Sequence, residues 1–346
     1  MRRGTTRVRI VGADCNKYHL AAADCDERRL LPPTEADREV WLDAVFQGAD
    51  AVDLILPQPD CDVAALASVS TTPEWRAKLV LPSPGAIAIA QDKLDTVLTL
   101  TAAGLPVPMT IPYPPKLTDV ACETLGWPMW VRARHGAGSR GSFRAWTLEQ
   151  VHIWIESCRY NKSIQPDDFI LCAYLPGAEY GCQLLYWHGT LLVSQTRERV
   201  EYLYGYLSPT GQSSSPAVAR TVANTALDTL ADQAVRALDY EPHGVYGVDM
   251  KCDTQGRPHI TEINAGRFYT TIDFLASAGL NLPEILVKLH RGDTIPVLGC
   301  SPLAANQYWV RTADCLPRLV RYTDLMTLEK ERTVCRTQAP LSVPTR

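Results

Sequence analysis

The sequence predicts an α/β protein in which a Rossmann-like parallel layer precedes mixed α+β units. In residues 1–90, short apolar runs alternate with helix-like segments, a pattern typical of parallel strands joined by crossover helices. From residue 127 onward, apolar runs come in pairs around glycine-containing turns, which is typical of antiparallel hairpins. With 46% hydrophobic and 21% charged residues among 346, the chain is too apolar for disorder and long enough for two or three packed units.

The net charge and the cysteines indicate which partners and which compartment the protein has. The net charge of −4 disfavours a nucleic-acid or anionic-membrane partner. The sequence has no apolar run near the ~18 residues of a membrane span, and its basic first residues are not followed by an apolar secretory segment. Eleven scattered cysteines without a CxxC motif indicate reduced thiols. We therefore expect a cytoplasmic protein; a homodimer is left open.

The first unit, residues 1–90, is expected to alternate strands with helices. The apolar pattern predicts strands at 7–12, 51–57 and 78–82, with helices at 38–47 and 63–69. Its first strand is followed by Val11-Gly12-Ala13-Asp14 rather than by GxGxxG, which disfavours a dinucleotide site.

The rest of the chain changes from helix to mostly strand. A helix is predicted over 91–103, where Gly104 and Pro106 end it. The remaining helices are expected at 119–125, 148–158 and 218–238, and the strands at 130–134, 142–146, 169–175, 182–187, 191–197, 244–252 and 258–264.

The first candidate site is the glycine-rich connection between two of these strands. Gly136, Gly138 and Gly141 let backbone N–H groups approach an anion without a side chain in the way, and Ser139 and Arg140 add a hydroxyl and a cation. An ordinary flexible hairpin loop is the alternative.

The second candidate is a set of three oxygen ligands on a predicted hairpin. Glu262 and Asn264 share one face of their strand because side chains alternate, and Asp249 lies on the facing strand. Two carboxylates and an amide oxygen suit a hard cation such as Mg²⁺ carrying a nucleotide phosphate. The alternative is a polar sheet face exposed to water.

The third candidate is a group of single cations, Lys93, Arg132, Arg197, Arg199 and Arg267. Arg132 interrupts an apolar strand, and a buried cation needs a partner. Arg197 and Arg199 share one face of an extended segment, which suits phosphate or carboxylate capture. A structural ion pair, or a solvated strand end, is the alternative.

The fourth candidate is an apolar strand that runs into a Pro-Gly linker. Residues 170–175 could offer backbone amides to a flat base, and Glu179 follows within reach of a ribose. A core strand followed by a turn is the alternative.

The order of these features resembles the ATP-grasp superfamily, particularly the branch of carbamoyl-phosphate synthetase large chains and biotin carboxylase. The matching motifs begin with Gln91-Asp92-Lys93 and the segment 103–108, and continue with 127–132 and the glycine loop. They end with 174–180 and with Asp249 followed by Glu262-Ile263-Asn264. Arg267 lies one residue later than in the family's Asn-Pro-Arg, and Cys172 stands where an acidic residue is common.

The resemblance implies an ATP-grasp fold, in which two α+β subdomains grip ATP. It implies a pre-ATP-grasp domain at 1–90, a helical part of the core at 91–126, a small lid subdomain at 127–175, a large subdomain at 176–300 and an extension at 301–346. Lys93, Arg132 and the glycine loop (Gly136, Gly138, Ser139, Arg140, Gly141) would contact the phosphates. Adenine and ribose would be bound by Leu171, Cys172, Ala173, Tyr174, Leu175 and Glu179. Asp249, Glu262 and Asn264 would hold Mg²⁺, with Mn²⁺ as an alternative.

The implied activity is that of an ADP-forming ligase. Such an enzyme activates a small-molecule carboxylate as an acyl phosphate and couples it to an amine or another nucleophile. We expect Arg197, Arg199 and Arg267 to hold the carboxylate beside the γ-phosphate, because guanidinium groups bind carboxylates directionally. The alternatives are a kinase-like or carbamoyl-phosphate-type enzyme, and an ATP-binding regulatory protein without turnover.

Overall fold

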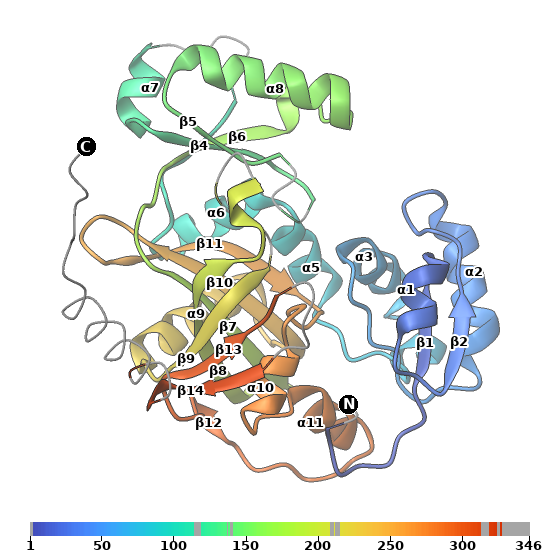
Figure 1. The fold of residues 1–346 in the computed structure, drawn as a ribbon. Helices are drawn as coiled ribbons and strands as arrows, with labels where there is room; N and C mark the ends of the chain where they lie inside the picture. Colours follow the sequence, from blue (N-terminus) through green and yellow to red (C-terminus); the bar gives the residue numbers. More distant parts are fainter. Residues whose placement is uncertain are drawn as a thin grey trace, which may run out of the picture.

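The computed structural model describes residues 3–113, 119–136, 138, 141–207, 211, 215–312, 318–323 and 326. They form three sheets with helices around them (Figure 1). None of the described helices is long and apolar enough to cross a membrane.

The N-terminal unit is built on a two-stranded parallel sheet. Strands β1 (Val11–Asp14) and β2 (Glu27–Leu30) pair in parallel, and α1 (Lys17–Ala22) joins them. The helices that follow are α2 (Arg38–Ala49), α3 (Asp60–Val69) and α4 (Pro73–Arg76). The parallel crossover was expected, but α1 and β2 were not, and the first strand begins at residue 11 rather than 7.

The expected strands at 51–57 and 78–82 are wrong. They form only one isolated parallel bridge, between Ile55 and Leu79. Their apolar side chains are divided between two cores, because Ile55 packs against one cluster while Leu54 and Leu56 pack against another. An apolar run of this length indicates that its residues are buried. Here they are buried without forming the hydrogen-bond ladder of a sheet.

The expected helix at 91–103 begins at residue 93, after a break at Asp92 that ends a preceding helix not expected from the sequence. Helix α5 (Pro84–Gln91) ends there and α6 (Lys93–Ala102) begins. Asp92 has an extended backbone, and its carboxylate accepts from the N–H groups of Leu94 and Asp95, as an N-cap does. The break places Lys93 at the first position of α6.

A small unit covers one end of the molecule, at the top of Figure 1. Its four-stranded sheet has the order β3 (Thr110–Pro112), β6 (Phe169–Ala173), β4 (Met129–Ala133), β5 (Phe143–Ala145). Helices α7 (Asp119–Leu125) and α8 (Leu148–Lys162) pack with this sheet around a core that includes Met129, Val131 and Phe169. A short 3-10 turn, η1 (Pro166–Asp168), leads into β6.

The large sheet has eight strands in the described part of the chain. Its order is β11 (Pro258–Ala265), β10 (Gly244–Cys252), β7 (Glu179–Trp187), β8 (Thr190–Tyr202), β9 (Pro216–Val222), β13 (Gln307–Val310), β14 (Arg318–Arg321), and β12 (Gly299–Cys300) pairs with β8. The remaining elements are η2 (Gly205–Leu207), α10 (Asp273–Ser277) and α11 (Leu282–His290). The two expected hairpins, β7–β8 and β10–β11, are confirmed.

The expected helix at 218–238 is correct only from residue 225. Its first part is the strand β9, in which Ala219 and Thr221 are buried. Helix α9 (Thr225–Leu238) begins after Asn224, whose side chain accepts from the N–H of Ala226. An asparagine at this point is a strong N-cap signal, so the boundary could have been found in the sequence.

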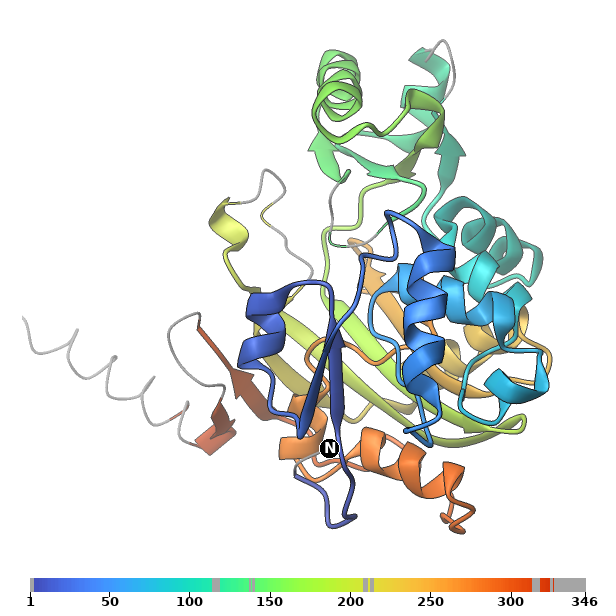
Figure 2. The ribbon, with the colours of Figure 1, turned by 90° about the vertical axis from the view of Figure 1, so that its right-hand side faces the viewer.

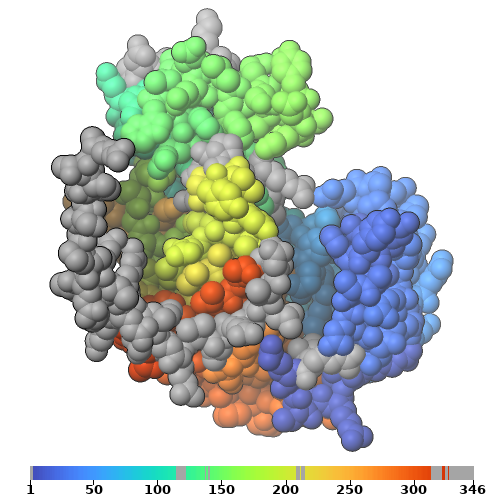
Figure 3. Space-filling view, in the orientation of Figure 1, coloured from blue at the N-terminus to red at the C-terminus, as the bar shows by residue number. Residues whose placement is uncertain are grey.

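The three units enclose a cavity. Figure 2 shows the small unit above the large sheet and the N-terminal helices beside it. In the space-filling view of Figure 3, a hollow separates the small unit from the N-terminal unit.

The N-terminal residues contact the large unit at α11. The backbone N–H groups of Thr5 and Thr6 donate hydrogen bonds of 2.8 Å to the side chain of Glu284 on this helix.

Candidate active site

A cavity of about 990 Å³ lies where the small sheet, the large sheet and the start of α3 meet. Sixteen of the nineteen predicted site residues contribute to its lining. They are Lys93, Arg132, Gly136, Gly138, Gly141, Cys172, Ala173, Tyr174, Leu175, Glu179, Arg197, Arg199, Asp249, Glu262, Asn264 and Arg267.

 Of the other three, Leu171 is buried in the core of the small unit, and Ser139 and Arg140 lie outside the described residues.

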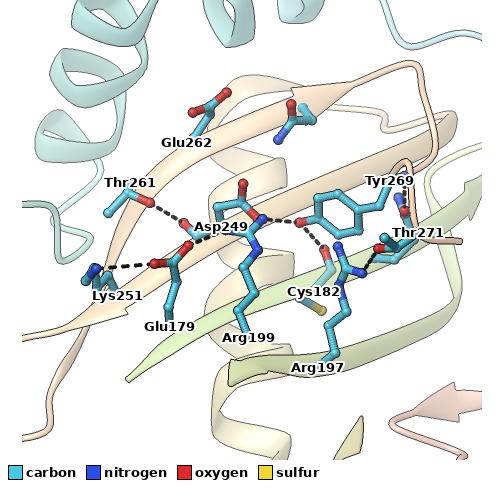
Figure 4. Close-up of polar contacts among 12 residues, drawn as sticks. Glu179, Cys182, Arg197, Arg199, Asp249, Lys251, Thr261, Glu262, Tyr269 and Thr271 are labelled. Atoms are coloured by element: carbon cyan, nitrogen blue, oxygen red, sulfur yellow. Dashed lines mark hydrogen bonds and ion pairs between the residues drawn. The ribbon is translucent and has the colours of Figure 1, made fainter. Parts of the chain in front are cut away.

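The predicted metal ligands lie side by side on the large sheet. Asp249 on β10 is in register with Glu262 on β11 (Figure 4). Asn264 is two residues further along β11. All three line the cavity. Adjacent strands are about 4.8 Å apart, so the two carboxylates can reach one bound cation.

Each of these three side chains is contacted by an arginine. Arg199 lies 2.8 Å from the Asp249 carboxylate, and Arg132 of the small unit lies 2.8 Å from that of Glu262. Arg267 donates to the side-chain oxygen of Asn264. Guanidinium groups therefore surround these oxygens with positive charge. A phosphate carried by a metal ion needs such positive charge around it.

Charge balance around Glu262 favours its ionised form. Burial would raise the pKa of this carboxyl group, but the positive charges of Lys93, Arg132 and Arg267 outweigh burial and lower it. Burial also lowers the pKa of the Lys93 ammonium, against the attraction of Glu262. The carboxylate is thus held as an anion and available as a hard-metal ligand.

Lys93 connects the large unit to the glycine loop. Its Nζ donates to the backbone carbonyl of Gly136 at 2.6 Å, and its backbone N–H donates to Arg134 O at 3.1 Å. Asp92, beside it, accepts from Arg134 Nε at 2.7 Å. The start of the loop is therefore fixed to the α5–α6 junction, and Gly141 packs at its other end against Ala133.

The strand β6 and the linker after it form one wall of the cavity. Cys172, Ala173, Tyr174 and Leu175 line it, and Trp130 on the neighbouring strand β4 lies 6.3 Å from Tyr174 between ring centroids. An apolar, aromatic wall of this kind suits a flat base.

Glu179 lies at the centre of an ion network where β7 begins. It pairs with Arg199 and with Lys251, which is 3.2 Å away, and it accepts from the hydroxyl of Tyr202. Burial would raise the pKa of Glu179, but Arg199 and Lys251 lower it. The carboxylate is therefore charged and fixed in place.

The alternation expected around Glu198 is confirmed. Arg197 and Arg199 both line the cavity, whereas Glu198 points to the other side of the sheet and lies 2.6 Å from Arg220. The three arginines expected to hold a carboxylate differ, however, in what they already bind. Arg199 pairs with two carboxylates and Arg267 with Asp60, but Arg197 donates to the hydroxyl of Thr271.

Several residues of the site were not predicted from the sequence. Tyr269 donates its hydroxyl hydrogen bond to Asp249 at 2.9 Å, and Asp60 reaches Arg267 from the start of α3. Lys251 and Tyr202 complete the Glu179 network. Lys251 lies two residues after Asp249 on the same strand, so alternation could have identified it. Asp60 and Tyr269 carry no local signal, because tertiary packing alone brings them to the cavity.

Tyr269 lies on two glycines of the sheet. A Cβ at Gly247 would meet the Tyr269 ring at 2.8 Å, and a Cβ at Gly181 would meet its hydroxyl at 3.3 Å. Gly181 and Gly247 lie on the neighbouring strands β7 and β10. The absence of side chains at these two positions makes room for the ring against the sheet.

Replacing Gly247 with alanine is therefore expected to lower the free energy of unfolding by about 1–3 kcal/mol, because the buried Tyr269 ring must move. Urea denaturation measures this. Gly85→Ala is the matched control, since no atom lies within 4 Å of a Cβ there. Equal stability of the two variants would contradict the packing of Tyr269 described here.

The donor set fits a magnesium ion. Two carboxylates in register and a neighbouring amide oxygen are the hard oxygen ligands that Mg²⁺ takes, usually with water and phosphate oxygens completing the shell. The described residues contain no group of three or more His, Cys, Asp or Glu side chains arranged for a metal ion.

Sequence comparisons find similarity to an ATP-grasp family model and to D-alanine–D-alanine ligases. Residues 165–299 match the family model described as ATP-grasp in the biosynthetic pathway with Ter operon. The D-alanine–D-alanine ligase of Mycolicibacterium vanbaalenii is 28% identical over 273 residues, covering 71% of each chain. That of Mycobacterium tuberculosis is 27% identical over 268 residues, covering 71% of this chain and 69% of the relative.

Solved structures show the same fold. Biotin carboxylase from Campylobacter jejuni superposes with a TM-score of 0.65 at 16% identity, covering 86% of this chain and 68% of the other. L-amino acid ligase from Bacillus licheniformis does so with a TM-score of 0.62 at 14% identity, covering 88% and 79%. These likenesses show that the chain shares the fold of these enzymes, and that residues 165–299 carry the sequence pattern of an ATP-grasp family model.

Proposed function

We propose that this protein is an ADP-forming carboxylate–amine ligase. The observation that carries the proposal is the meeting of two sets of side chains in one cavity. Arg132 brings positive charge from the small unit and Lys93 brings it from the start of α6, and Asp249, Glu262 and Asn264 bring oxygen ligands from the large sheet. Phosphoryl transfer to a carboxylate needs position and positive charge far more than an acid–base residue.

The reaction has two steps. A carboxylate oxygen attacks the γ-phosphorus of ATP, and the bond from that phosphorus to the bridging oxygen breaks, releasing ADP and leaving an acyl phosphate. The amine nitrogen then attacks the acyl carbon, the C–O bond to phosphate breaks, and the nitrogen loses a proton as the amide forms. The protein contributes by holding these groups together in a cavity lined by cations.

Each part of the cavity has a proposed partner. Lys93, Arg132 and the glycine loop bind the phosphates, residues 171–175 bind adenine and Glu179 binds the ribose. Asp249, Glu262 and Asn264 hold Mg²⁺, which supplies neutralisation of phosphate charge when it is bound. In this assignment residues 1–90 are a pre-ATP-grasp domain, 91–126 the helical part of the core, 127–175 the lid and 176–300 the large subdomain.

Two relatives guide the choice of substrates. D-alanine–D-alanine ligases and L-amino acid ligase are named for joining amino acids. We therefore propose a small carboxylic acid as the group that is activated and an amine-bearing small molecule as the nucleophile. The acid that is activated would lie near Arg199 and Arg267, which line the cavity beside the proposed metal ligands.

A screen for ADP release tests the proposal. Purified protein with ATP and Mg²⁺ is offered pairs of L- or D-amino acids and other small carboxylates, with hydroxylamine added in parallel. A ligase releases ADP with a new amide, and hydroxylamine converts the acyl phosphate to a hydroxamate. Release of ADP with a stable phosphorylated product would instead indicate a kinase-like enzyme, and protein that binds ATP without releasing ADP would contradict an enzymatic role.

A further inference from the structure

Among the described arginines that line the cavity, Arg197 alone is buried without an acidic partner in ion-pair contact. Only 4% of its surface is exposed. Among the described residues no carboxylate lies within ion-pair distance of it, whereas Arg199 and Arg267 both pair with aspartates. Its guanidinium donates to the Thr271 hydroxyl and lies 4.5 Å from the centre of the Tyr269 ring, and its Nε has no partner.

No carboxylate of the described residues pairs with Arg197, although Asp249, two strands away, attracts its positive charge from beyond ion-pair distance. Two buried glutamines lie around it, but their oxygen atoms are already used: Gln183 accepts from Tyr269 N at 2.8 Å, and Gln195 accepts from Leu303 N at 3.0 Å. Burial and the nearby charge of Arg199 lower the pKa of Arg197 to about 10, so it remains protonated at neutral pH. Burying a cation without an anionic partner costs free energy, and a bound anionic ligand would offset this cost.

The position of Arg197 separates it from the proposed metal. Arg197, Gly181, Asp249 and Glu262 occupy one row across the neighbouring strands β8, β7, β10 and β11. The Tyr269 ring lies over Gly181, between the arginine and the carboxylates (Figure 4). An anion bound to Arg197 is thus held apart from the point where phosphate is transferred.

We propose that Arg197 anchors a carboxylate that is bound but not phosphorylated, and that the nucleophile is therefore an amino acid rather than a simple amine. This inference rests on the proposed ligase function. A donor with two carboxylates would bring a second net negative charge beside the nucleotide phosphates. In an amino acid the amine offsets the charge of the carboxylate. An amino acid can therefore bind Arg197 with less repulsion from the nucleotide phosphates.

The test compares amino acids with their primary amides, which keep the amine and lack the carboxylate. L- and D-amino acids and the corresponding amides are titrated into the full-length protein with ADP and Mg²⁺, and binding is followed by thermal melting. We expect one or more amino acids, but not their amides, to raise the melting temperature. Arg197→Met should weaken that binding on the order of 100-fold, as loss of a buried charged partner does.

Two further readouts separate an anchor from a structural role. Without ligand, Arg197→Met should melt at or above the wild-type temperature, because it removes an unpaired buried charge. In turnover with an active substrate pair, it should raise KM for the amino-acid nucleophile and leave KM for ATP unchanged. Arg220→Met, which removes an arginine on the other side of the sheet, is the control and should change neither KM.

The outcomes distinguish this inference from the proposed function. Equal binding of amide and acid, or unchanged binding by Arg197→Met, would overturn the anchor. Protection by dicarboxylic acids alone would overturn the amino-acid nucleophile. Amino-acid binding that depends on Arg197, without ADP release from any pair in the screen, would support the anchor and count against the ligase function.

Discussion

Glu262→Gln is expected to lower the rate of Mg²⁺-dependent ADP formation by about 100-fold or more while the fold stays intact. The substitution keeps the size of the side chain and removes the charge that lies opposite Asp249 in the register of β10 and β11. A metal ligand that neutralises developing charge is worth several kcal/mol in the transition state. Asn264→Ala removes the amide oxygen and should have a similar effect.

The measurement is steady-state ADP release over a range of Mg²⁺ concentrations, with circular dichroism to check the fold. Glu198→Gln is the matched control, because Glu198 lies on the other side of the same sheet and pairs with Arg220. Near-wild-type turnover of Glu262→Gln or Asn264→Ala would show that the metal assignment is wrong.

The parts of the fold that follow from local patterns were predictable from the sequence. Alternation and turn residues identified the hairpins β7–β8 and β10–β11, and alternation placed Arg197 and Arg199 on the cavity side. The errors arose where an apolar run was taken for regular structure. Residues 51–57 pack against the cores without a ladder, and the apolar pattern runs on from β9 into α9, so that only Asn224, which caps α9, marks the boundary.

The composition of the site was predictable, but its ion pairs were not. The motifs locate Glu179, Asp249 and Glu262, yet nothing local indicates that Arg199 bridges the first two or that Arg132 crosses from the small unit to the third. These contacts join residues far apart in the chain, so only the packed structure reveals them. Arg199 pairs with two carboxylates, whereas Arg197, two positions earlier in the sequence, pairs with none among the described residues. This difference also arises from the packing of distant segments.

Arg199→Met is expected to lower the free energy of unfolding by about 3–5 kcal/mol at neutral pH. The guanidinium is buried between the carboxylates of Glu179 and Asp249, and removal of one partner leaves uncompensated buried charge. Urea denaturation measures the change. Arg220→Met is the control, because its ion pair with Glu198 is partly exposed and should contribute only about 0–1 kcal/mol.

The pH dependence of this loss identifies its cause. In the wild type the pKa of Glu179 lies below its ordinary value, because Arg199 and Lys251 outweigh burial; the resulting stability is present at neutral pH and is lost as the pH falls. Without Arg199, burial should raise the pKa of Glu179 above that of the unfolded chain, about 4.3. The variant should then regain stability relative to the wild type as the pH falls from 7 toward about 4–5, because protonation removes the buried charge. A stability difference that stays constant over this range would mean that Arg199 acts through packing of its side chain rather than through its charge.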